Sequence, residues 1–566
     1  MKSSLLLLVS LAALAAAPAL EIKIDQAGYL PGAPKIALVA FSRPAADFVI
    51  RKSANNAIAF RGTLSAPVSD ADSGDTLQAA DFSRLTRTGA YYLEVPGLGR
   101  SWNFSIAPDV YRRVYYLAMR SYYGQRCGTA VDLGPDFPGY RHPACHLAGA
   151  YHSSSGKSGP RESQGGWHDA GDYGRYVVNS GITTGTLLWT WEIFGPRIQK
   201  VDLKIPESGS RTPSILSEIR WNLDWLLTMQ DGDGGVWHKQ TSDRFCGFVM
   251  PDKDTLVSYV IGSGQSPFKT SCATADFAAV MAIAARVYRR FDPAFAAAAL
   301  RAAQKAWTWL DRFPNAIFRN PPGISTGEYG DRDCADERLW AAAELWRTTR
   351  DAAFERYFLD HYEAFRSQLR PIGPQGWANL SNLALWTYAL GGGADRGAVD
   401  AIRQDSLAAA DRICERTAAN PYHVSLAARD YIWGSNSVAA NYAMQLLIAN
   451  EMRKDPRYVT TALDDLHYLL GRNTFSLSFV TRVGDNPVRH PHHRPSGADN
   501  NPEPWPGLLA GGPNRGRQDA AMQKLSPTLP PARMYLDEQA AYSANEVAIN
   551  WNAPLVFLLA AVQPPR

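Results

Sequence analysis

The segment from Gly165 to Tyr173, Gly-Gly-Trp-His-Asp-Ala-Gly-Asp-Tyr, combines small residues, aromatic rings and two carboxylates. Asp169 and Asp172 stand close together in it, and His168 directly precedes the first. Glycines let a backbone approach a ligand closely, and neighbouring carboxylates raise each other's pKa and can share a proton or a water. Rings and carboxylates together are what a sugar-cleaving site needs. An isolated Asp-x-x-Asp is more often an acidic surface turn, so the interpretation depends on the rest of the chain.

A further carboxyl candidate, Glu546, lies near the C-terminus. It stands near the start of the segment 545–561, whose apolar residues predict a helix. A charge that merely suits the helix dipole is the simpler interpretation. The nearby Asn545, Asn550 and Asn552 favour instead a hydrogen-bonded, partly buried carboxyl, and burial would raise its pKa as a general acid requires.

The loop 472–544 contains the cluster Pro491-His492-His493-Arg494. It could form a second metal site or a solvated basic patch. It could also donate hydrogen bonds to sugar hydroxyls and hold carboxylates in their charged form, with Arg494 permanently cationic. The residues by themselves leave these alternatives open.

Two cysteines and two histidines suggest a metal. Cys127, Cys145, His146 and His168 offer the ligand set of a closed structural zinc site. Their spacing matches no short zinc-finger pattern, so zinc and a Cys127–Cys145 disulfide stay equal alternatives. The other cysteines are scattered, and we predict that they are mostly buried small hydrophobes: Cys246, Cys272, Cys334 and Cys414.

The N-terminus predicts export. Lys2 is followed by an apolar run from Leu5 to Ala17, which is typical of a secretory signal peptide with cleavage near Ala19. The run is too short for a membrane span, and we expect no later segment to be one. The predicted compartment is the periplasm or the cell exterior.

The charge balance excludes one class of partner. A formal charge of +4 is small against 58 basic and 54 acidic residues, and it argues against a nucleic-acid binder. The 16 Trp and 25 Tyr are mostly core residues by expectation, although stacking on sugars is a further use for them in an exported protein. We expect a monomer.

The elements that must position these residues fall into two groups. Alternating strands separated by turn clusters predict a small antiparallel sandwich over 20–106. From 107 to 566 the pattern is helical with almost no strand signal, and it predicts helices at 110–118, 215–229, 273–288, 295–310, 338–348, 380–390, 398–413, 437–452, 459–470 and 545–561. About a dozen helices with long loops exclude a four-helix bundle. A ring of paired helices would bury their apolar faces and gather the loops at one end.

Three regions carry a resemblance to a known family. Asp169-Ala-Gly-Asp172, the stretch Ser478–Arg494, and Tyr535–Ala553 resemble the hallmark regions of family 9 glycoside hydrolases, the cellulase family. The resemblance extends to the segments 326–329, 336–340 and 433–436. The N-terminal strands resemble the immunoglobulin-like domain that precedes the catalytic module in one branch. The resemblance implies a mainly α protein, with an (α/α)6 barrel after a small all-β sandwich, and hydrolysis of β-1,4-glucosidic bonds with inversion.

The resemblance also implies roles for the candidate residues. Asp172 is expected to be the general base, Asp169 to hold the water, and Glu546 to be the general acid. Inversion needs about 6.5–9.5 Å between acid and base, which a distant glutamate provides more readily than a partner in the same turn. His492 and Arg494 match positions that contact sugar and the catalytic carboxylates. Further matches line the cleft: Trp433, Tyr329, His238 and Trp551.

Two structural metals are implied as well. In the immunoglobulin-bearing branch a zinc is held near the active loop by two Cys and two His, which Cys127, Cys145, His146 and His168 match. Asp336 and Glu337 match a calcium-binding pair, with loop oxygens near 332–333. A further acidic ligand falls near Gln375, which is not acidic, so a solvated acidic turn stays the alternative. Asp499 is another candidate ligand.

The leading hypothesis is a secreted or periplasmic endo-β-1,4-glucanase. The second is an exo-acting cellodextrinase or a glucosaminidase-like variant on the same fold. A sugar-binding protein on a degenerate fold is less consistent with three intact carboxylates, and a zinc hydrolase would need an open position on the metal. Since no carbohydrate-binding module follows the last helix, we expect soluble or amorphous β-glucan, rather than crystalline cellulose, as substrate.

Overall fold

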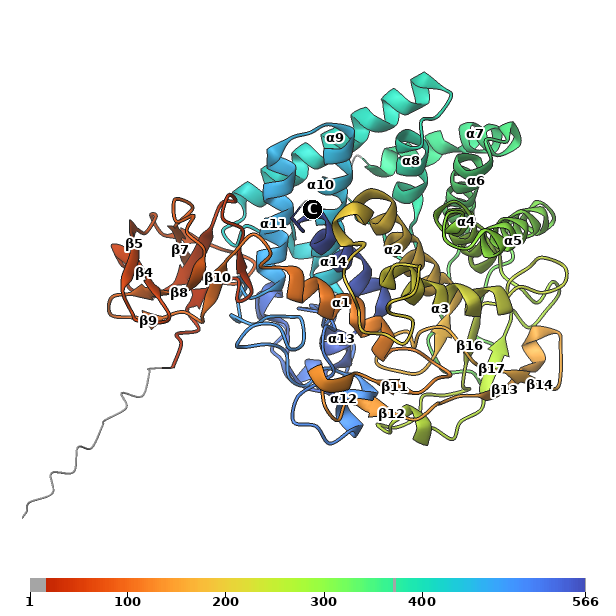
Figure 1. Cartoon of the computed structure of the whole chain (residues 1–566), viewed down its shortest axis with the longest axis horizontal. Helices are drawn as coiled ribbons and strands as arrows, with labels where there is room; N and C mark the ends of the chain where they lie inside the picture. The colour runs from red at the N-terminus through yellow and green to blue at the C-terminus, as the bar shows by residue number, and fades with distance from the viewer. Residues whose placement is uncertain (1–16, 370–372, 565–566) are drawn as a thin grey trace, which may run out of the picture.

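The computed structural model describes residues 17–369 and 373–564. The predicted signal peptide falls mainly on residues 1–16, which lie outside the described residues. The described chain forms a β-sandwich that packs against the side of a helical ring (Figure 1).

The sandwich is made of two sheets whose inward side chains form a common core. Alternation along the strands puts one face of each sheet into this core, where Tyr29 packs edge-on against Phe82 and Phe104. One sheet has the strand order β1 (Ile22–Lys23), β3 (Ile36–Ala40), β7 (Thr76–Asp81) and β6 (Val68–Ser69). The other has the order β2 (Gly28–Tyr29), β10 (Phe104–Ile106), β8 (Gly89–Val95), β4 (Asp47–Lys52) and β5 (Ile58–Thr63), with β9 (Gly99–Arg100) on β8. The predicted sandwich is confirmed, although β2 and β10 pair in parallel.

The ring has inner and outer helices in the part of the chain that the structure describes. The inner helices are largely buried because neighbours cover them; α4, for example, is buried at every position but Arg286. They are α2 (Val177–Ile198), α4 (Ser271–Tyr288), α6 (Ala335–Thr349), α8 (Ser381–Leu390), α10 (Ser435–Met452) and α14 (Ile549–Ala561). Contact between α14 and α2 closes the ring.

Each inner helix packs against an outer partner. The outer helices are α1 (Arg112–Gly124), α3 (Ser214–Thr228), α5 (Pro293–Arg312), α7 (Ala352–Leu369), α9 (Arg396–Ala419) and α11 (Pro456–Leu469). They are amphipathic: on α5 the alanines 299, 303 and 306 form the buried stripe. Small residues let the helices approach closely, since a Cβ on Gly185 of α2 would lie 2.6 Å from the Trp340 ring of α6.

The helix prediction needs three corrections. Helices α2 and α7 were not expected, and the last helix begins at Ile549 rather than near Asn545. Strands were also missed between the helices. A five-stranded sheet has the order β14 (Pro160–Glu162), β13 (Ala148–Tyr151), β17 (Ser258–Ile261), β16 (Lys239–Thr241) and β15 (Arg175–Tyr176). These strands are two to four residues long, too short to show a period of two.

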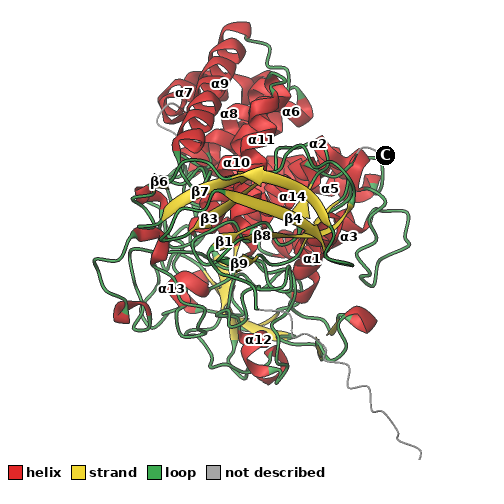
Figure 2. Ribbon diagram, turned by 90° about the vertical axis from the view of Figure 1, so that its left-hand side faces the viewer, coloured by secondary structure: helices red, strands yellow, loops and turns green. Residues whose placement is uncertain are grey.

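The loops gather at one end of the ring, as predicted. Figure 2 shows them in the lower half, with the short helices α12 (Arg494–Ala498) and α13 (Tyr542–Asn545) among them. The sandwich docks on the ring through buried polar contacts: Lys23 Nζ donates to the Thr474 carbonyl (2.7 Å), and His467 Nδ1 of α11 lies 2.7 Å from Asp25 Oδ2.

Two further expectations were wrong. Cys272 and Cys334 form a disulfide that joins the start of α4 to the start of α6, whereas we predicted two isolated buried cysteines. Helix α4 is long and apolar enough to cross a membrane, although we expected no such segment after the N-terminus. Because 94% of that stretch is buried among the other helices, its composition is that of a core helix.

Candidate active site

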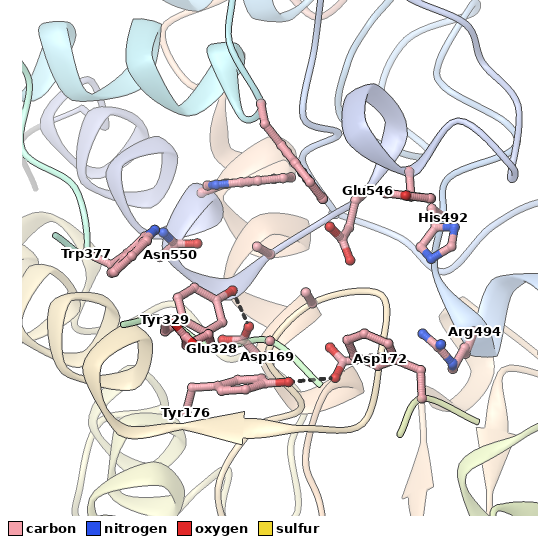
Figure 3. A pocket seen from close by; sticks show the side chains of 17 residues that line it. Asp169, Asp172, Tyr176, Glu328, Tyr329, Trp377, His492, Arg494, Glu546 and Asn550 are labelled. Atoms are coloured by element: carbon pink, nitrogen blue, oxygen red, sulfur yellow. Dashed lines mark hydrogen bonds between the residues drawn. The ribbon is translucent and has the colours of Figure 1, made fainter. Parts of the chain in front are cut away.

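The loop end of the ring contains a cavity of about 670 Å³. It collects side chains that are far apart in the sequence, and Figure 3 shows the carboxyl of Glu546 on one side and Asp169 and Asp172 on the other. Aromatic rings form much of the remaining wall. The lining residues are Asp169, Ala170, Asp172, Tyr176, Phe245, Gly327, Glu328, Tyr329, Trp377, Trp433, His492, Arg494, Tyr542, Glu546, Ala548, Asn550 and Trp551.

Asp169 is held rigidly in the turn before β15. It is 1% exposed, its Oδ2 accepts a 2.6 Å hydrogen bond from the Tyr329 hydroxyl, and its Oδ1 accepts one from the Asn179 amide on α2. Burial, and then the charge of Asp172, raise the pKa of Asp169 to about 8. The turn needs its glycine, because a Cβ on Gly171 would lie 2.1 Å from the His492 carbonyl oxygen.

Asp172 lies on the same wall with one oxygen engaged. Its Oδ2 accepts hydrogen bonds from the Gly174 N–H (3.0 Å) and the Tyr176 hydroxyl (3.2 Å). Its Oδ1 makes no hydrogen bond to another described residue, and Asp172 lines the cavity. The arrangement leaves one carboxylate oxygen to accept a proton from a water in the cavity.

Glu546 faces the two aspartates across the cavity (Figure 3). It was expected at the start of a helix, but it lies in extended backbone between α13 and α14, with φ −68° and ψ 162°. A parallel bridge to His492 and the bond from the Gly511 N–H to its carbonyl (2.8 Å) fix this backbone. Removal of the carboxyl from water, and then the charge of Asp172, raise its pKa well above the usual value. Such a group keeps its proton to a higher pH than an ordinary glutamic acid does.

His492 and Arg494 both line the cavity. His492 Nδ1 donates to the Gln539 carbonyl (2.7 Å), and burial lowers the pKa of the ring, so that Nε2 carries no proton. Arg494 donates to the carbonyls of Gly171 (2.8 Å) and Cys246 (3.1 and 3.0 Å). It therefore ties the turn that holds Asp169 and Asp172 to the loop around Cys246, and its hydrogen bonds go to backbone carbonyls rather than to the carboxylates.

The structure brings Trp433, Tyr329 and Trp551 to the cavity wall, where they were expected. His238 is placed elsewhere. It is 1% exposed, stacks on Phe318 at 3.7 Å between centroids, and its Nε2 lies 3.0 Å from the Glu328 carbonyl. It contacts the loop that carries Tyr329 through the Glu328 carbonyl and does not line the cavity.

Sequence reasoning missed several residues of the wall. Trp377 and Phe245 stand in no motif, and only their aromatic character could have suggested them. Tyr542 falls within the stretch Tyr535–Ala553 but was not named as a site residue. Lys239 was missed as well: its buried Nζ donates to Asn320 Oδ1 (2.7 Å), Thr326 Oγ1 (3.1 Å) and the Gly327 carbonyl (2.7 Å). It fastens the same Tyr329 loop to β16.

The four expected zinc ligands come together beside the turn that holds Asp169 and Asp172. One ligand atom from each of Cys127, Cys145, His146 and His168 lies within 4.8 Å of the others. Cys145 Sγ and His168 Nε2 are 3.9 Å apart, near the ~3.6 Å expected for sulfur and nitrogen on one tetrahedral zinc.

Both cysteines are free thiols, so the alternative of a Cys127–Cys145 disulfide is wrong. Burial opposes ionisation of Cys127, but contact with Cys145 and the charge of Arg175 outweigh it and hold the pKa of Cys127 well below its usual value. A thiolate, two imidazoles and a second sulfur fit zinc.

The acidic pair Asp336 and Glu337 is buried, which contradicts a solvated turn. Both oxygens of Glu337 lack a hydrogen-bond partner among the described residues, and so do both oxygens of the equally buried Asp276 on α4. Burial, and then neighbouring acidic groups, raise the pKa of Glu337 and of Asp276 well above the usual values. These unsatisfied oxygens fit a hard cation such as calcium. Asp499 does not, because both of its oxygens accept from Asn501 and Trp505.

Comparison with known proteins shows which family this chain resembles. The sequence profile of Glycosyl hydrolase family 9 matches residues 111–559, and that of the Cellulase N-terminal ig-like domain matches residues 17–100. The chain is 38% identical over 545 residues to Endoglucanase D of Acetivibrio thermocellus, which covers 95% of this chain and 83% of that protein. It is 34% identical over 562 residues to the Cellodextrinase of Butyrivibrio fibrisolvens, with 96% and 99% covered.

A solved structure agrees with the fold. The Zn-binding triple mutant of the GH family 9 endoglucanase J30 superposes with a TM-score of 0.88 at 36% identity, over 95% of this chain and 100% of that one. The ring is therefore the predicted (α/α)6 barrel, and the N-terminal sandwich is the predicted immunoglobulin-like domain.

Proposed function

The chain belongs to glycosyl hydrolase family 9, and we propose that it is an endo-β-1,4-glucanase that inverts the anomeric centre. Its substrates are cellulose chains, cello-oligosaccharides or mixed-linkage β-glucan. The observation that carries this proposal is the position of Glu546, a carboxyl with a raised pKa, across an aromatic-lined cavity from Asp169 and Asp172. An inverting glycosidase needs an acid and a base on opposite faces of the sugar ring.

The carboxylates divide the chemistry between them. Glu546 donates its proton to the leaving glycosidic oxygen, because its surroundings keep the acid form. Asp172 takes a proton from the attacking water through the oxygen that the protein leaves open. Asp169 holds the same water, while Tyr329 and Asn179 fix its carboxyl. After one turnover the proton has moved from Glu546 to the product, and Asp172 has gained one from water.

The aromatic side chains in the cavity wall suit an extended sugar chain as the substrate. Trp433, Trp377 and Trp551 offer flat apolar faces on which sugar rings stack. Endoglucanase D, the relative with 38% identity, and the J30 enzyme are both endoglucanases by name, which favours internal cleavage over the cellodextrinase or glucosaminidase-like alternative. Intact carboxyls disfavour a protein that only binds sugar.

We propose that the two metals are structural. Zinc bound by Cys127, Cys145, His146 and His168 would polarise its ligands and hold the residue next to Asp169. Four protein ligands leave no open position for a reacting water, which disfavours a zinc hydrolase. Calcium held by Asp336 and Glu337 would neutralise the buried carboxyls between α4 and α6.

The remaining proposals concern the whole protein. We propose that the segment 1–19 directs export to the periplasm or the cell exterior, with domains at 20–106 and 107–566. The working form is proposed to be a monomer. Neither nucleic acid nor a membrane is a partner in this proposal.

Hydrolysis of carboxymethylcellulose and of cellohexaose tests the function. Asp172→Ala and Glu546→Gln should each lower kcat at least ~100-fold, because each removes a group that acts in the transition state. Glu538→Gln is the matched control, since Glu538 is exposed and near Glu546 in sequence. NMR of the first product should show the α-anomer. Near-normal turnover of either variant, or a β-anomer product, would contradict the mechanism.

A further inference from the structure

The zinc ligand His146 is bonded on its far side to an acidic residue of another loop. Its Nε2 lies 3.3 Å from Asp254 Oδ2, and the two side chains are 6% and 5% exposed. Its Nδ1 is buried and has no hydrogen-bond partner among the described residues. One ring nitrogen is therefore engaged by a carboxylate, and the other is free for the metal.

Asp254 stands at the base of a loop that reaches the catalytic cavity. Its other oxygen, Oδ1, accepts from the Leu256 N–H (3.0 Å) and so fixes the loop backbone. Farther along, the Val249 carbonyl accepts from the Tyr173 hydroxyl (2.6 Å), and the Cys246 carbonyl accepts from Arg494. Phe245, 47% exposed, belongs to the cavity wall.

We propose that Asp254 is a positioning residue of the zinc centre and couples it to the 243–256 loop of the catalytic cavity. This rests on the proposed zinc. A carboxylate that accepts the second N–H of a ligating histidine sets the ring's tautomer and orientation and raises its basicity. Asp254 directs the proton to Nε2 and leaves the Nδ1 lone pair of His146 for the metal.

The same contacts connect the zinc centre to a second wall of the cavity. His168 directly precedes Asp169, so one histidine ties the metal to the catalytic turn. His146 and Asp254 tie it to the facing loop. At the cavity, Arg494 links the turn directly to this loop, because its guanidinium donates hydrogen bonds to the Gly171 carbonyl of the turn and the Cys246 carbonyl of the loop. The zinc centre therefore sets the spacing of two walls of the substrate cavity.

Zinc affinity of the Asp254→Asn protein tests the proposal. The change keeps the size of the side chain and removes its charge, and outer-sphere partners of this kind typically affect affinity 10–100-fold. Competition with a chromophoric chelator should show zinc bound about 10–100-fold more weakly than by the wild type. The matched control is Asp252→Asn, whose carboxylate lies in the same loop but pairs with Lys253 (2.9 Å) instead of His146.

Limited trypsin digestion measures how readily the 243–256 loop is cleaved. The loop offers exposed cleavage sites at Arg244 and Lys253, whose side chains are 64% and 72% exposed. Chelation of zinc should speed cleavage at these sites in the wild type. In the zinc-loaded Asp254→Asn protein cleavage should already be fast, and the substrate KM should rise more than kcat falls.

The outcomes separate the two proposals. If the wild type retains no zinc, the proposed zinc centre fails, and this inference fails with it. If the wild type binds zinc but Asp254→Asn binds it as tightly as Asp252→Asn does, the inference alone is overturned. A circular dichroism spectrum that matches the wild type would show that the Asp254→Asn protein is folded. The Asp254→Glu variant keeps a carboxylate at this position and should therefore bind zinc more tightly than Asp254→Asn does.

Discussion

The Tyr329 hydroxyl donates a 2.6 Å hydrogen bond to Oδ2 of Asp169, from a loop 160 positions along the chain. Tyr329 itself has a left-handed backbone, with φ 44°, which a tyrosine adopts only when its surroundings impose it. Lys239 of β16 and the preceding His238 bond to carbonyls of that loop. The position of the Asp169 carboxyl therefore depends on a loop and a strand that lie far from it in the sequence.

Tyr329→Phe should lower kcat by about 2–10-fold, because a hydrogen bond between uncharged groups contributes about 0.5–1.5 kcal/mol and the raised pKa of Asp169 favours its protonated form. The aromatic wall stays intact, so KM should change little. Steady-state kinetics on cellohexaose measures both values. Tyr362→Phe, on the outer helix α7, is the control. A kcat equal to that of the control would show that Tyr329 does not orient Asp169.

Activity should persist well above the ordinary pKa of a glutamic acid. Glu546 must be protonated to act, and its surroundings raise its pKa well above 4.5. The alkaline limb of kcat/KM reports the acid of the free enzyme. In a profile measured on neutral cellohexaose, this decline should therefore come at a pH well above the ordinary pKa of a glutamic acid. A fall already complete by pH 5 would contradict the assignment.

Asp169 should make stability depend on pH. Its folded pKa of about 8 lies above the unfolded value of 3.8, so the fold favours the protonated form. Its contribution to stability is complete at low pH and declines as pH rises from about 4 to about 8, by at most about 1.4 kcal/mol per unit. Thermal unfolding should show that Asp169→Asn gains stability relative to the wild type between pH 4 and pH 8. If the difference in stability between Asp169→Asn and the wild type stays the same over this pH range, Asp169 is ionised throughout it.

Lys239→Met should disorder the Tyr329 loop. The substitution keeps the length of the side chain but leaves the Gly327 carbonyl and the Asn320 amide oxygen without their donor, at a cost of about 1–3 kcal/mol each. We expect a lower melting temperature and a kcat reduced in the manner of Tyr329→Phe. Lys305→Met, at an exposed position of α5, is the control. If the double variant with Tyr329→Phe loses the full product of the two single effects on kcat, Lys239 does not act through Tyr329.

Loss of the Cys272–Cys334 disulfide should destabilise the barrel. The bridge closes a loop with a sequence separation of 62, for which chain entropy predicts about 4 kcal/mol. Denaturant unfolding of Cys272→Ala/Cys334→Ala should show a loss of this order, and Cys414→Ala, a buried free thiol, serves as the control. A double variant as stable as the control would mean that the bridge does not form in solution.

Much of the site was predictable because its residues stand in contiguous motifs. Asp169, Asp172, His492 and Glu546 were identified from local pattern and resemblance, and all of them line the cavity. The helical ring was predictable because its apolar residues recur at helical spacing over many turns. Helix α2 was missed because it is buried on nearly all sides, so its sequence shows no polar face.

What the sequence by itself determined is the set of chemical groups: three carboxyls, a cluster of thiols and imidazoles, and the helices and strands that local periodicity specifies. Only the tertiary structure decided which groups meet. It paired Cys272 with Cys334, stacked His238 on Phe318 outside the cavity lining, set Asp276 beside Glu337, and joined His146 to Asp254. These contacts join residues that are far apart in the chain, and their distances follow from the packing of whole helices and loops. Spacing along the sequence carries no record of that packing.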